Sequence, residues 1–208
     1  MTLDDAVAQC PIVAILRGVR PEEVLDIAEA LYGAGVRAVE VPLNSPGPLA
    51  SVGRLAATFG TQMACGAGTV LSAADVERSA RAGARFVVAP NTDAAVIRRA
   101  IELGLDPAPG FATASEAFAA IAAGARHLKL FPAATYGPGH LRQLGAVLPR
   151  EAAVWAVGGV AAGDLRAWWD AGARGFGIGS EIYKPGQSAD ETTAKAATLV
   201  EAARALGG

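Results

Sequence analysis

The chain has 208 residues, of which 52% are hydrophobic and only 18% are charged. This balance excludes a disordered chain and predicts a single domain, spanning residues 1–208, with a large apolar core. The formal net charge is −2 and the basic residues are scattered singly, so we expect no nucleic-acid partner.

The start of the chain, residues 1–9, carries two aspartates and has no positive region followed by an apolar stretch, so we do not interpret it as a signal peptide. The longest uncharged run, residues 55–74, is interrupted by three glycines and does not fit a membrane span. We therefore expect a cytoplasmic protein with no membrane partner.

A four-residue pattern recurs where helical periodicity gives way to an apolar run. Its glycine suits the position just after the last helical turn, where the backbone becomes left-handed. The apolar run that follows is typical of a strand buried on both faces. The four copies are Ala34-Gly35-Val36-Arg37, Ala82-Gly83-Ala84-Arg85, Ala123-Gly124-Ala125-Arg126 and Ala171-Gly172-Ala173-Arg174.

Strand and helix patterns alternate along the whole chain with a period of roughly 20 to 26 residues. We predict strands at 12–17, 37–42, 63–68, 85–90, 106–109, 127–131, 153–158 and 174–179. We predict helices at 22–33, 48–58, 73–82, 93–103, 114–123, 138–147, 161–171 and 189–206. Eight alternating units predict an α/β protein that folds as a single (β/α)8 TIM barrel.

An open, doubly wound sheet would show the same alternation of strands and helices. Such a sheet usually carries its glycine fingerprint after the first strand, where this chain has only Gly18. The glycine pairs of this chain come late, at Gly158-Gly159 and at Gly177 with Gly179. Because a phosphate site after strands seven and eight is typical of the barrel, we favour the barrel.

One of only three lysines lies inside an apolar strand pattern, His127-Leu128-Lys129-Leu130-Phe131. Side chains alternate along a strand, so Leu128 and Leu130 should face the helices while Lys129 points into the barrel. Burial lowers the pKa of a lysine, and its neutral amine can attack a ketone to form an iminium. Lys129 is therefore a candidate nucleophile, although snorkelling or a structural ion pair is the alternative.

Glu40 is the second charge that strand alternation directs into the barrel, since Val39 and Val41 take the outer face. It could form an ion pair with Arg17 or Lys129 that only neutralises the centre of the barrel. Cleavage of a carbon–carbon bond through an iminium, however, needs a group that accepts the C4 hydroxyl proton and manages water loss. A carboxylate beside the lysine can do both, so Glu40 is the candidate acid and base.

Candidate binding groups stand at the strand ends. Arg17 ends the first strand, where its guanidinium could grip a carboxylate, and Thr69 follows a glycine-rich end of the third strand. Two late glycine loops, expected to lead into helix N-termini, could offer N–H groups to a phosphate. These loops contain Gly158, Gly159, Gly179 and Ser180. Tyr183, just after the second loop, is interpreted as loop surface.

Cysteine and histidine usage favours no metal site. Cys10 and Cys65 lack the spacing of a zinc site or a redox pair, and we expect both to be buried in a reducing compartment. His127 and His140 have no cysteine or carboxylate at ligand spacing. We interpret His127 as a core histidine that lies deeper in the barrel than Lys129.

Together these motifs resemble the family of 2-keto-3-deoxy-6-phosphogluconate and 6-phosphogalactonate aldolases, over residues 11–206. The segments that carry the resemblance are Ala14-Ile15-Leu16-Arg17-Gly18, Val39-Glu40-Val41-Pro42-Leu43-Asn44-Ser45-Pro46, Gly66-Ala67-Gly68-Thr69-Val70, Pro109-Gly110-Phe111-Ala112-Thr113, Leu128-Lys129-Leu130-Phe131-Pro132 and Ala156-Val157-Gly158-Gly159-Val160. The resemblance implies a lyase that cleaves a phosphorylated keto-deoxy sugar acid into pyruvate and glyceraldehyde 3-phosphate. It also implies a homotrimer without cofactor or metal.

The resemblance further implies a role for each candidate residue. Lys129 would form the Schiff base and Glu40 would act as acid and base. Arg17 and Thr69 would bind on the side of the pyruvyl carboxylate. The residues implied around the phosphate are Gly158, Gly159, Gly179 and Ser180.

The match is closer to the galactonate branch of the family. The gluconate branch usually has an arginine near Asn44 and a threonine in place of Val157, and this chain has neither. Val157 is therefore the candidate specificity residue, with a gluconate or dual-specificity enzyme as the alternative.

A phosphosugar isomerase or epimerase and a non-catalytic sugar-phosphate-binding barrel are more distant alternatives, which covalent trapping with pyruvate would separate from an aldolase.

Overall fold

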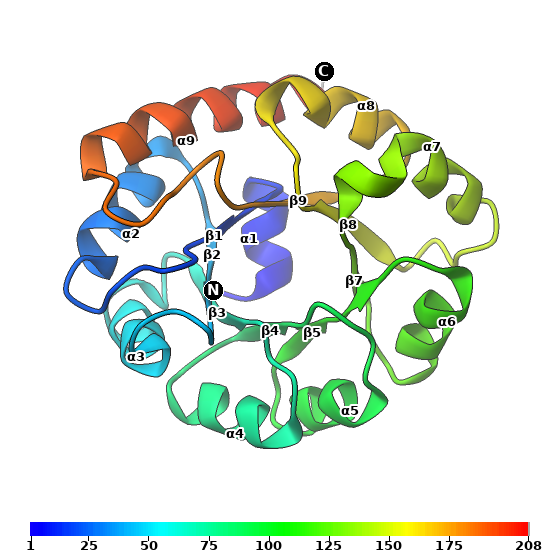
Figure 1. Cartoon of the computed structure of the whole chain (residues 1–208), viewed down its shortest axis with the longest axis horizontal. Coiled ribbons are helices and arrows are strands. Elements are labelled where there is room, and N and C mark those ends of the chain that lie inside the picture. Colours follow the sequence, from blue (N-terminus) through cyan, green and yellow to red (C-terminus); the bar gives the residue numbers. More distant parts are fainter. Residues whose placement is uncertain (208) are drawn as a thin grey trace.

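The computed structural model describes residues 1–207, in which parallel strands form one sheet that curls into a barrel surrounded by helices (Figure 1). The strand order around the sheet is β5-β4-β3-β2-β1-β9-β8-β7-β6. The strands are β1 Ile12–Ile15, β2 Ala38–Pro42, β3 Ala64–Gly68, β4 Phe86–Val88, β5 Asp106–Ala108, β6 Gly110–Phe111, β7 His127–Leu130, β8 Ala153–Val157 and β9 Gly175–Ile178. The predicted (β/α)8 barrel is confirmed.

The predicted fifth strand is divided into β5 and β6, which flank Pro109. Proline has no N–H to donate to a strand ladder, so the pairing changes partner at this residue. β5 pairs with β4, whereas β6 pairs with β7, and the Pro109 carbonyl accepts a hydrogen bond from Lys129 N at 2.9 Å. The two half-strands therefore close the barrel as one broken strand.

The helices lie outside the strands (Figure 1). They are α2 Val24–Ala34, α3 Pro48–Phe59, α4 Ala73–Arg81, α5 Ala94–Glu102, α6 Ala114–Ala122, α7 Ala133–Gly145, α8 Leu165–Asp170 and α9 Ala189–Arg204, with short 3-10 helices η1 Ala162–Asp164 and η2 Ala205–Gly207. The helices α2 to α8 each lie between two consecutive strands of the chain, and α9 follows the last strand. All eight predicted helices are present. The glycine of each repeat has a positive φ, as expected after a helix: Gly35, Gly83, Gly124 and Gly172.

α7 begins earlier than the predicted 138–147. Its first turn starts at Ala133, and the helical backbone is interrupted at Gly137, where φ is 74° and ψ is 165°. Pro138 then starts the second segment, a position that proline tolerates because the first N–H groups of a helix have no partner within it. Only this second segment corresponds to the predicted helix.

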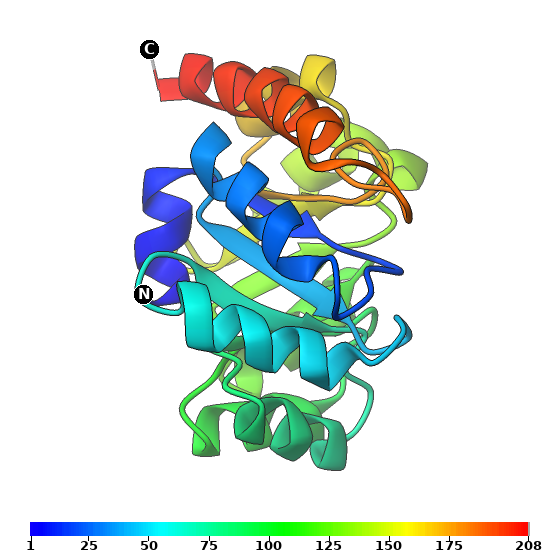
Figure 2. The ribbon, with the colours of Figure 1, turned by 90° about the vertical axis from the view of Figure 1, so that its left-hand side faces the viewer.

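An additional helix, α1 (Leu3–Gln9), was not predicted and lies across the N-terminal end of the barrel (Figure 1). Thr2 and Asp5 form a capping box that starts it. Leu3 and Ala6 are fully buried and pack against the residues that fill the barrel interior. Figure 2 shows α1 at one end of the barrel and the loops that follow β1, β2 and β9 at the opposite end.

Apolar residues form two layers that follow the predicted alternation. Leu128 and Leu130 belong to the layer between strands and helices. A separate cluster fills the barrel and contains Leu3, Ala6, Val13, Ile15, Ala38, Ala64, Phe86, Val88, Ala108, Trp155 and Val157.

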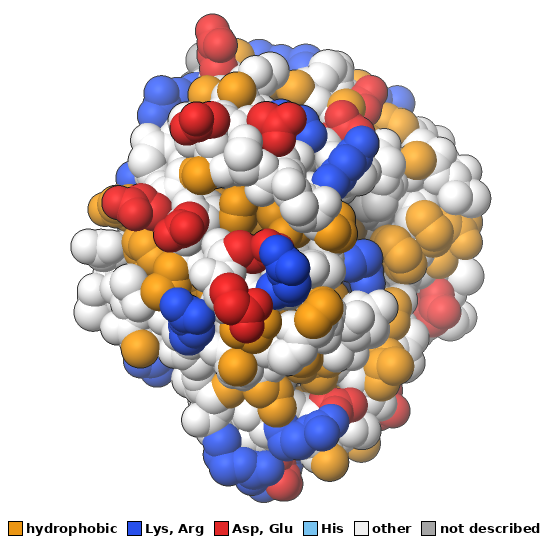
Figure 3. Space-filling view, turned by 60° about the vertical axis from the view of Figure 1, so that its left-hand side comes forward, with side chains coloured by type: hydrophobic (Ala, Val, Ile, Leu, Met, Phe, Trp, Pro, Cys, Tyr) orange, Lys and Arg blue, Asp and Glu red, His pale blue; other side chains and the backbone are white. Residues whose placement is uncertain are grey.

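No helix within residues 1–207 is long and apolar enough to span a membrane. On the side that carries α2 and α3, acidic and basic side chains are interspersed (Figure 3).

Candidate active site

Lys129 and Glu40 are buried inside the barrel, as their strand positions predict. Lys129 lies on β7 and is 6% exposed, while Glu40 lies on β2 and is 3% exposed. The Lys129 Nζ atom is 4.6 Å from the centre of the Phe131 ring. The barrel therefore holds an amine and a carboxyl group in an environment that excludes most water.

The Glu40 carboxyl group occupies space that only a glycine leaves open. A Cβ atom on Gly68 of β3 would lie 1.3 Å from Glu40 Oε2. The same Oε2 atom has no hydrogen-bond partner among the described residues. A buried oxygen without a partner costs free energy, and such atoms are concentrated where a ligand or a reacting group completes the site.

Electrostatics push both groups toward their neutral forms. Burial raises the pKa of Glu40, although the charges of Lys129 and Arg17 oppose this shift. Burial lowers the pKa of Lys129, and Arg17 adds to that shift while Glu40 opposes it. The site thus favours an amine that can act as a nucleophile and a carboxyl group that can exchange protons.

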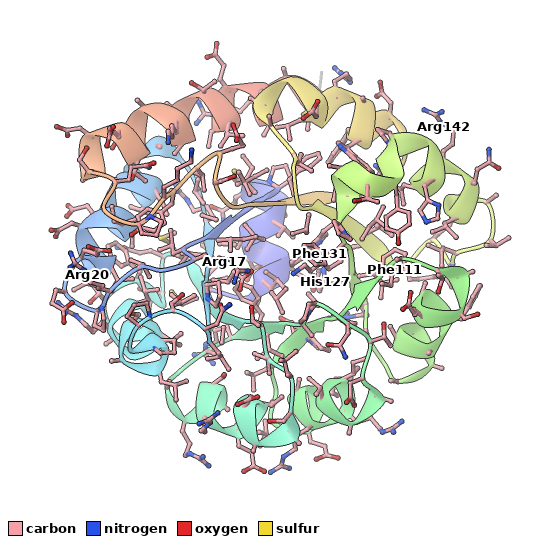
Figure 4. All side chains as sticks on the ribbon, viewed as in Figure 1. Arg17, Arg20, Phe111, His127, Phe131 and Arg142 are labelled. Atoms are coloured by element: carbon pink, nitrogen blue, oxygen red, sulfur yellow. The ribbon has the colours of Figure 1, made fainter. Side chains whose placement is uncertain are left out.

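Arg17 follows β1 and lies near the centre of the barrel mouth, whereas Arg20 and Arg142 lie further out (Figure 4). Its Nη1 atom donates a hydrogen bond to Asn44 Oδ1 at 2.8 Å. Asn44 stands in the loop after β2, and its neighbour Ser45 accepts a hydrogen bond from Gly18 N at 2.9 Å. The loops after β1 and β2 are therefore joined at the place where Arg17 is held.

Thr69 has an unusual backbone conformation, with φ at +56°. A β-branched residue in this left-handed region is strained by about 1–3 kcal/mol, and such strain is concentrated at functional sites. Thr69 directly follows Gly68, so it stands at the end of β3 next to the space that Glu40 occupies. The sequence predicted a ligand contact here without indicating the strain.

The first glycine loop follows β8 and is tightly turned. Gly158 and Gly159 have φ values of 96° and 71°, which other residues rarely adopt. The Gly158 carbonyl accepts a hydrogen bond from Ala134 N at 3.0 Å, and a Cβ on Gly159 would lie 2.7 Å from the Ala134 Cβ. The loop is therefore packed against the start of α7, just after the strand that carries Lys129.

The second glycine loop differs from the prediction. Gly179 and Ser180 start a turn in which the Gly179 carbonyl accepts hydrogen bonds from Ile182 N and Tyr183 N, at 2.9 and 3.0 Å. The helix α9 begins only at Ala189, so this loop does not lead directly into a helix N-terminus. The N–H groups of Gly179 and Ser180 therefore belong to a turn that ends before α9 begins.

Val157 is buried, at 4% exposed, and shares the barrel interior with Trp155. A Cβ on Gly177 would lie 2.8 Å from a Val157 methyl group, so the glycine on β9 makes room for this side chain. Trp155 is paired with Lys129 in the strand register. Val157 and Trp155 are two residues apart on β8, and strand alternation accounts for their position on the same face.

His127 and the two cysteines are buried, as expected. His127 lies at the start of β7, and its Nε2 atom is 2.9 Å from an Asp4 carboxylate oxygen. Burial lowers its pKa. Among residues 1–207, no group of three or more His, Cys, Asp or Glu side chains is placed to hold a metal ion.

Tyr183 does not lie on the loop surface as interpreted from the sequence. It is only 3% exposed, and its hydroxyl donates a hydrogen bond to Glu23 Oε1 at 2.8 Å. Sequence reasoning missed this pair and the Arg17–Asn44 hydrogen bond because each joins two separate loops, and local sequence patterns do not show which side chains of different loops meet. The Glu181-Ile182-Tyr183 stretch offered only a weak signal, an aromatic residue where a loop was expected.

A family model described as KDPG and KHG aldolase matches residues 3–197. The chain belongs to this family. Like other KDPG and KHG aldolases it is a lyase. It is 46% identical, over 194 residues, to the 2-dehydro-3-deoxy-6-phosphogalactonate aldolase of Escherichia coli strain K12, with 93% of this chain and 95% of the relative covered.

Solved structures of KDPG and KHG aldolases have the same fold. One named "Native KDPGal structure" superposes with a TM-score of 0.94 at 45% identity, covering 96% of this chain and 97% of that chain. A KDPG aldolase from Legionella pneumophila, solved with pyruvate captured at low pH as a covalent carbinolamine intermediate, superposes with a TM-score of 0.81 at 25% identity. That superposition covers 97% of this chain and 96% of the Legionella chain.

Proposed function

We propose that this aldolase cleaves 2-dehydro-3-deoxy-6-phosphogalactonate into pyruvate and glyceraldehyde 3-phosphate through a Schiff base on Lys129. The observation that carries the proposal is the buried pair inside the barrel, Lys129 and Glu40, whose pKa values are both shifted by burial toward the neutral forms. The Legionella relative was captured with pyruvate as a covalent carbinolamine, which is the chemistry that a neutral buried lysine supports.

The first stage of the proposed reaction forms the iminium. The neutral Lys129 amine attacks the C2 ketone, and a proton moves from the nitrogen to the oxygen to give the carbinolamine. The Glu40 carboxyl group then donates a proton to the C2 hydroxyl, which leaves as water while the nitrogen lone pair forms the C=N bond. Glu40 is left as a carboxylate beside a positively charged iminium, which stabilises both charges.

The second stage breaks the carbon–carbon bond. The Glu40 carboxylate accepts the proton of the C4 hydroxyl, and the new carbonyl forms as the C3–C4 electrons move into the iminium to give an enamine. Glyceraldehyde 3-phosphate is the aldehyde released. Glu40 returns its proton to C3 of the enamine. Water then adds to C2 of the resulting iminium, and transfer of the surplus proton to the Glu40 carboxylate releases pyruvate and the neutral Lys129 amine.

The proposed binding groups surround this pair at the barrel mouth. Arg17 and Thr69 bind the pyruvyl carboxylate, where a guanidinium and a hydroxyl can both donate hydrogen bonds. The phosphate lies against the loops after β8 and β9, and the β9 loop is next to the loop that carries Arg17. The residues proposed to bind it are Gly158, Gly159, Gly179 and Ser180.

Val157 supports the galactonate-type substrate. It lies in the barrel interior two residues before Gly159, and its methyl groups cannot donate a hydrogen bond to a substrate hydroxyl. A threonine of nearly the same shape could donate one, which would favour the other C4 configuration. The galactonate aldolase of Escherichia coli, at 46% identity, supports the same assignment.

We further propose that residues 1–208 form one domain and that the enzyme is a cytoplasmic homotrimer. The family resemblance supports the trimer, and several large apolar side chains exposed on the isolated chain are candidates for the apolar core of its interfaces. They are Leu71, Ile101, Leu103, Phe118, Tyr136 and Val147. Sedimentation equilibrium of the purified protein tests the trimer, and a single species at monomer mass would refute it.

The decisive experiment is reductive trapping. Borohydride added with pyruvate should attach one pyruvyl-derived mass to the peptide that contains Lys129, because the hydride reduces the iminium to a stable amine. Lys184→Ala is the matched control, since Lys184 lies in the exposed loop after β9 and should leave the labelling unchanged. Labelling of a folded Lys129→Ala variant to the same extent as the natural protein would refute the assignment.

A further inference from the structure

The loops that follow β1 and β9 contact each other at the barrel mouth (Figures 1 and 2). They cover residues 16–23 and 179–188. A Cβ on Gly18 would lie 2.7 Å from Pro185 Cγ, so the two loops are packed against each other. The first loop contains the arginine proposed to bind the carboxylate, and the second contains the turn proposed to bind the phosphate.

A hydrogen bond between two buried or partly buried side chains fastens these loops. The Tyr183 hydroxyl donates to Glu23 Oε1 at 2.8 Å, across 160 residues of sequence. The other Glu23 oxygen accepts hydrogen bonds from the Arg20 guanidinium, the shorter at 2.9 Å. Burial opposes ionisation of Glu23, but the hydrogen bonds from Tyr183 and Arg20 outweigh it and lower its pKa. The acceptor is thus a carboxylate, which makes the bond from Tyr183 charge-assisted.

Tyr183 also belongs to the turn that holds Ser180. Its backbone N–H and that of Ile182 both donate to the Gly179 carbonyl, which fixes the turn from within. Gln187 donates a hydrogen bond to the Ile182 carbonyl at 2.8 Å, which holds the end of the turn. Fixing the Tyr183 side chain therefore fixes the position of the Gly179 and Ser180 N–H groups relative to the first loop.

We propose that Tyr183 and Glu23 are positioning residues that determine the selectivity of the enzyme for a phosphorylated aldehyde. They do so without touching the substrate, by holding the phosphate turn at a set distance from the loop that carries Arg17. This inference rests on the proposed function, because it takes the turn at Gly179 as the phosphate site. A substrate with a carboxylate at one end and a phosphate at the other needs both ends held at once, so the distance between the loops decides which aldehydes fit.

The test uses the reverse reaction, in which pyruvate condenses with either D-glyceraldehyde 3-phosphate or D-glyceraldehyde. In Tyr183→Phe, the loss of one charge-assisted hydrogen bond should raise the KM for the phosphorylated aldehyde about fivefold to tenfold, with kcat changed less than about twofold. The kcat/KM for D-glyceraldehyde should not change, because that aldehyde has no phosphate. The ratio of the two kcat/KM values should therefore fall by the same factor.

Two further variants separate positioning from simple destabilisation. Tyr32→Phe is the matched control, since Tyr32 lies on α2 against Phe59 and Arg37, and it should leave the ratio unchanged. Glu23→Ala should lower the ratio as Tyr183→Phe does. The double variant of Tyr183 and Glu23 should show no additional loss, because both single changes remove the same bond.

The result that overturns the inference is an unchanged ratio in folded Tyr183→Phe, even if its melting temperature falls. Should Tyr183→Phe fail to fold, an unchanged ratio in Glu23→Ala overturns it equally. Failure of the proposed function is detected separately by exchange of solvent deuterium into the methyl group of pyruvate. This exchange requires the Lys129 enamine but no phosphate, so its absence in the natural protein would refute the function itself.

Discussion

Gly68→Ala is expected to inactivate the enzyme through Glu40 while the barrel remains folded. The new Cβ would lie 1.3 Å from Glu40 Oε2 and 2.4 Å from its Cδ. An ordinary contact of a Cβ atom is 3.4–4 Å, so the Glu40 oxygen must move by roughly 2 Å. The backbone of Gly68 does not have a positive φ, so alanine itself is not strained there.

The magnitude follows from what that displacement does to proton transfer. A misplacement of about 1 Å at a reacting group can cost roughly 100-fold in rate, so we expect kcat to fall by about 100-fold or more. Overpacking inside the barrel should lower the free energy of unfolding by about 1–3 kcal/mol, which a protein of this size tolerates. The effect on catalysis should therefore exceed the effect on stability.

Turnover is measured by coupling pyruvate release to lactate dehydrogenase, and folding by circular dichroism during a thermal melt. Gly53→Ala on α3 is the matched control, because the nearest atom to its new Cβ is the Ala82 carbonyl oxygen at 3.7 Å. That variant should keep full activity, and helix propensity should make it slightly more stable. Near-normal turnover in Gly68→Ala would refute the reasoning, since the acid and base would then not need the position that Glu40 occupies.

Two further predictions concern side chains inside the barrel. Glu40→Gln keeps the shape of the side chain but removes the proton carrier, so turnover in the same assay should fall roughly 100-fold or more while the fold persists; near-normal turnover would leave Glu40 as a structural counter-charge. The natural enzyme should cleave the galactonate-type epimer with the higher kcat/KM. In Val157→Thr, the kcat/KM for the gluconate-type epimer should rise several-fold relative to the kcat/KM for the galactonate-type epimer. A new hydrogen bond of about 1 kcal/mol accounts for a change of this size. If the ratio of the two kcat/KM values is the same in Val157→Thr as in the natural enzyme, Val157 does not determine the specificity.

The alternation of side chains along a strand was sufficient to predict the centre of the site. Lys129 and Glu40 are charged residues inside otherwise apolar strands, and a parallel barrel strand leaves only two directions for a side chain. The orientation of Val157 followed from the same rule. The glycines at the helix ends were predictable because a left-handed residue is needed there, and few residues other than glycine adopt that conformation easily.

The features that the sequence did not reveal depend on packing or on contacts between distant segments. α1 is too short, at seven residues, to show a clear helical period. Tyr183 was assigned to the surface because its acceptor, Glu23, is 160 residues away. The start of the last helix near 189 was predicted, but the expectation that the turn at Gly179 leads into a helix N-terminus was wrong, because a glycine turn that leads into a helix and one that does not have similar local sequences.

The helix α1 closes one end of the barrel, so that the barrel is open only at the end that carries the loops after the strands (Figure 2). Leu3 and Ala6 of α1 pack against the cluster inside the barrel that contains Phe86 and Trp155. Trp155 lies beside Lys129 in the register of β7 and β8. Substrate and both products must then pass through the same mouth. On the proposed chemistry the phosphorylated aldehyde lies nearer that mouth, while pyruvate stays covalently attached behind it. On this proposal the aldehyde must leave before pyruvate, both because pyruvate is still bound covalently and because the aldehyde lies between it and the opening.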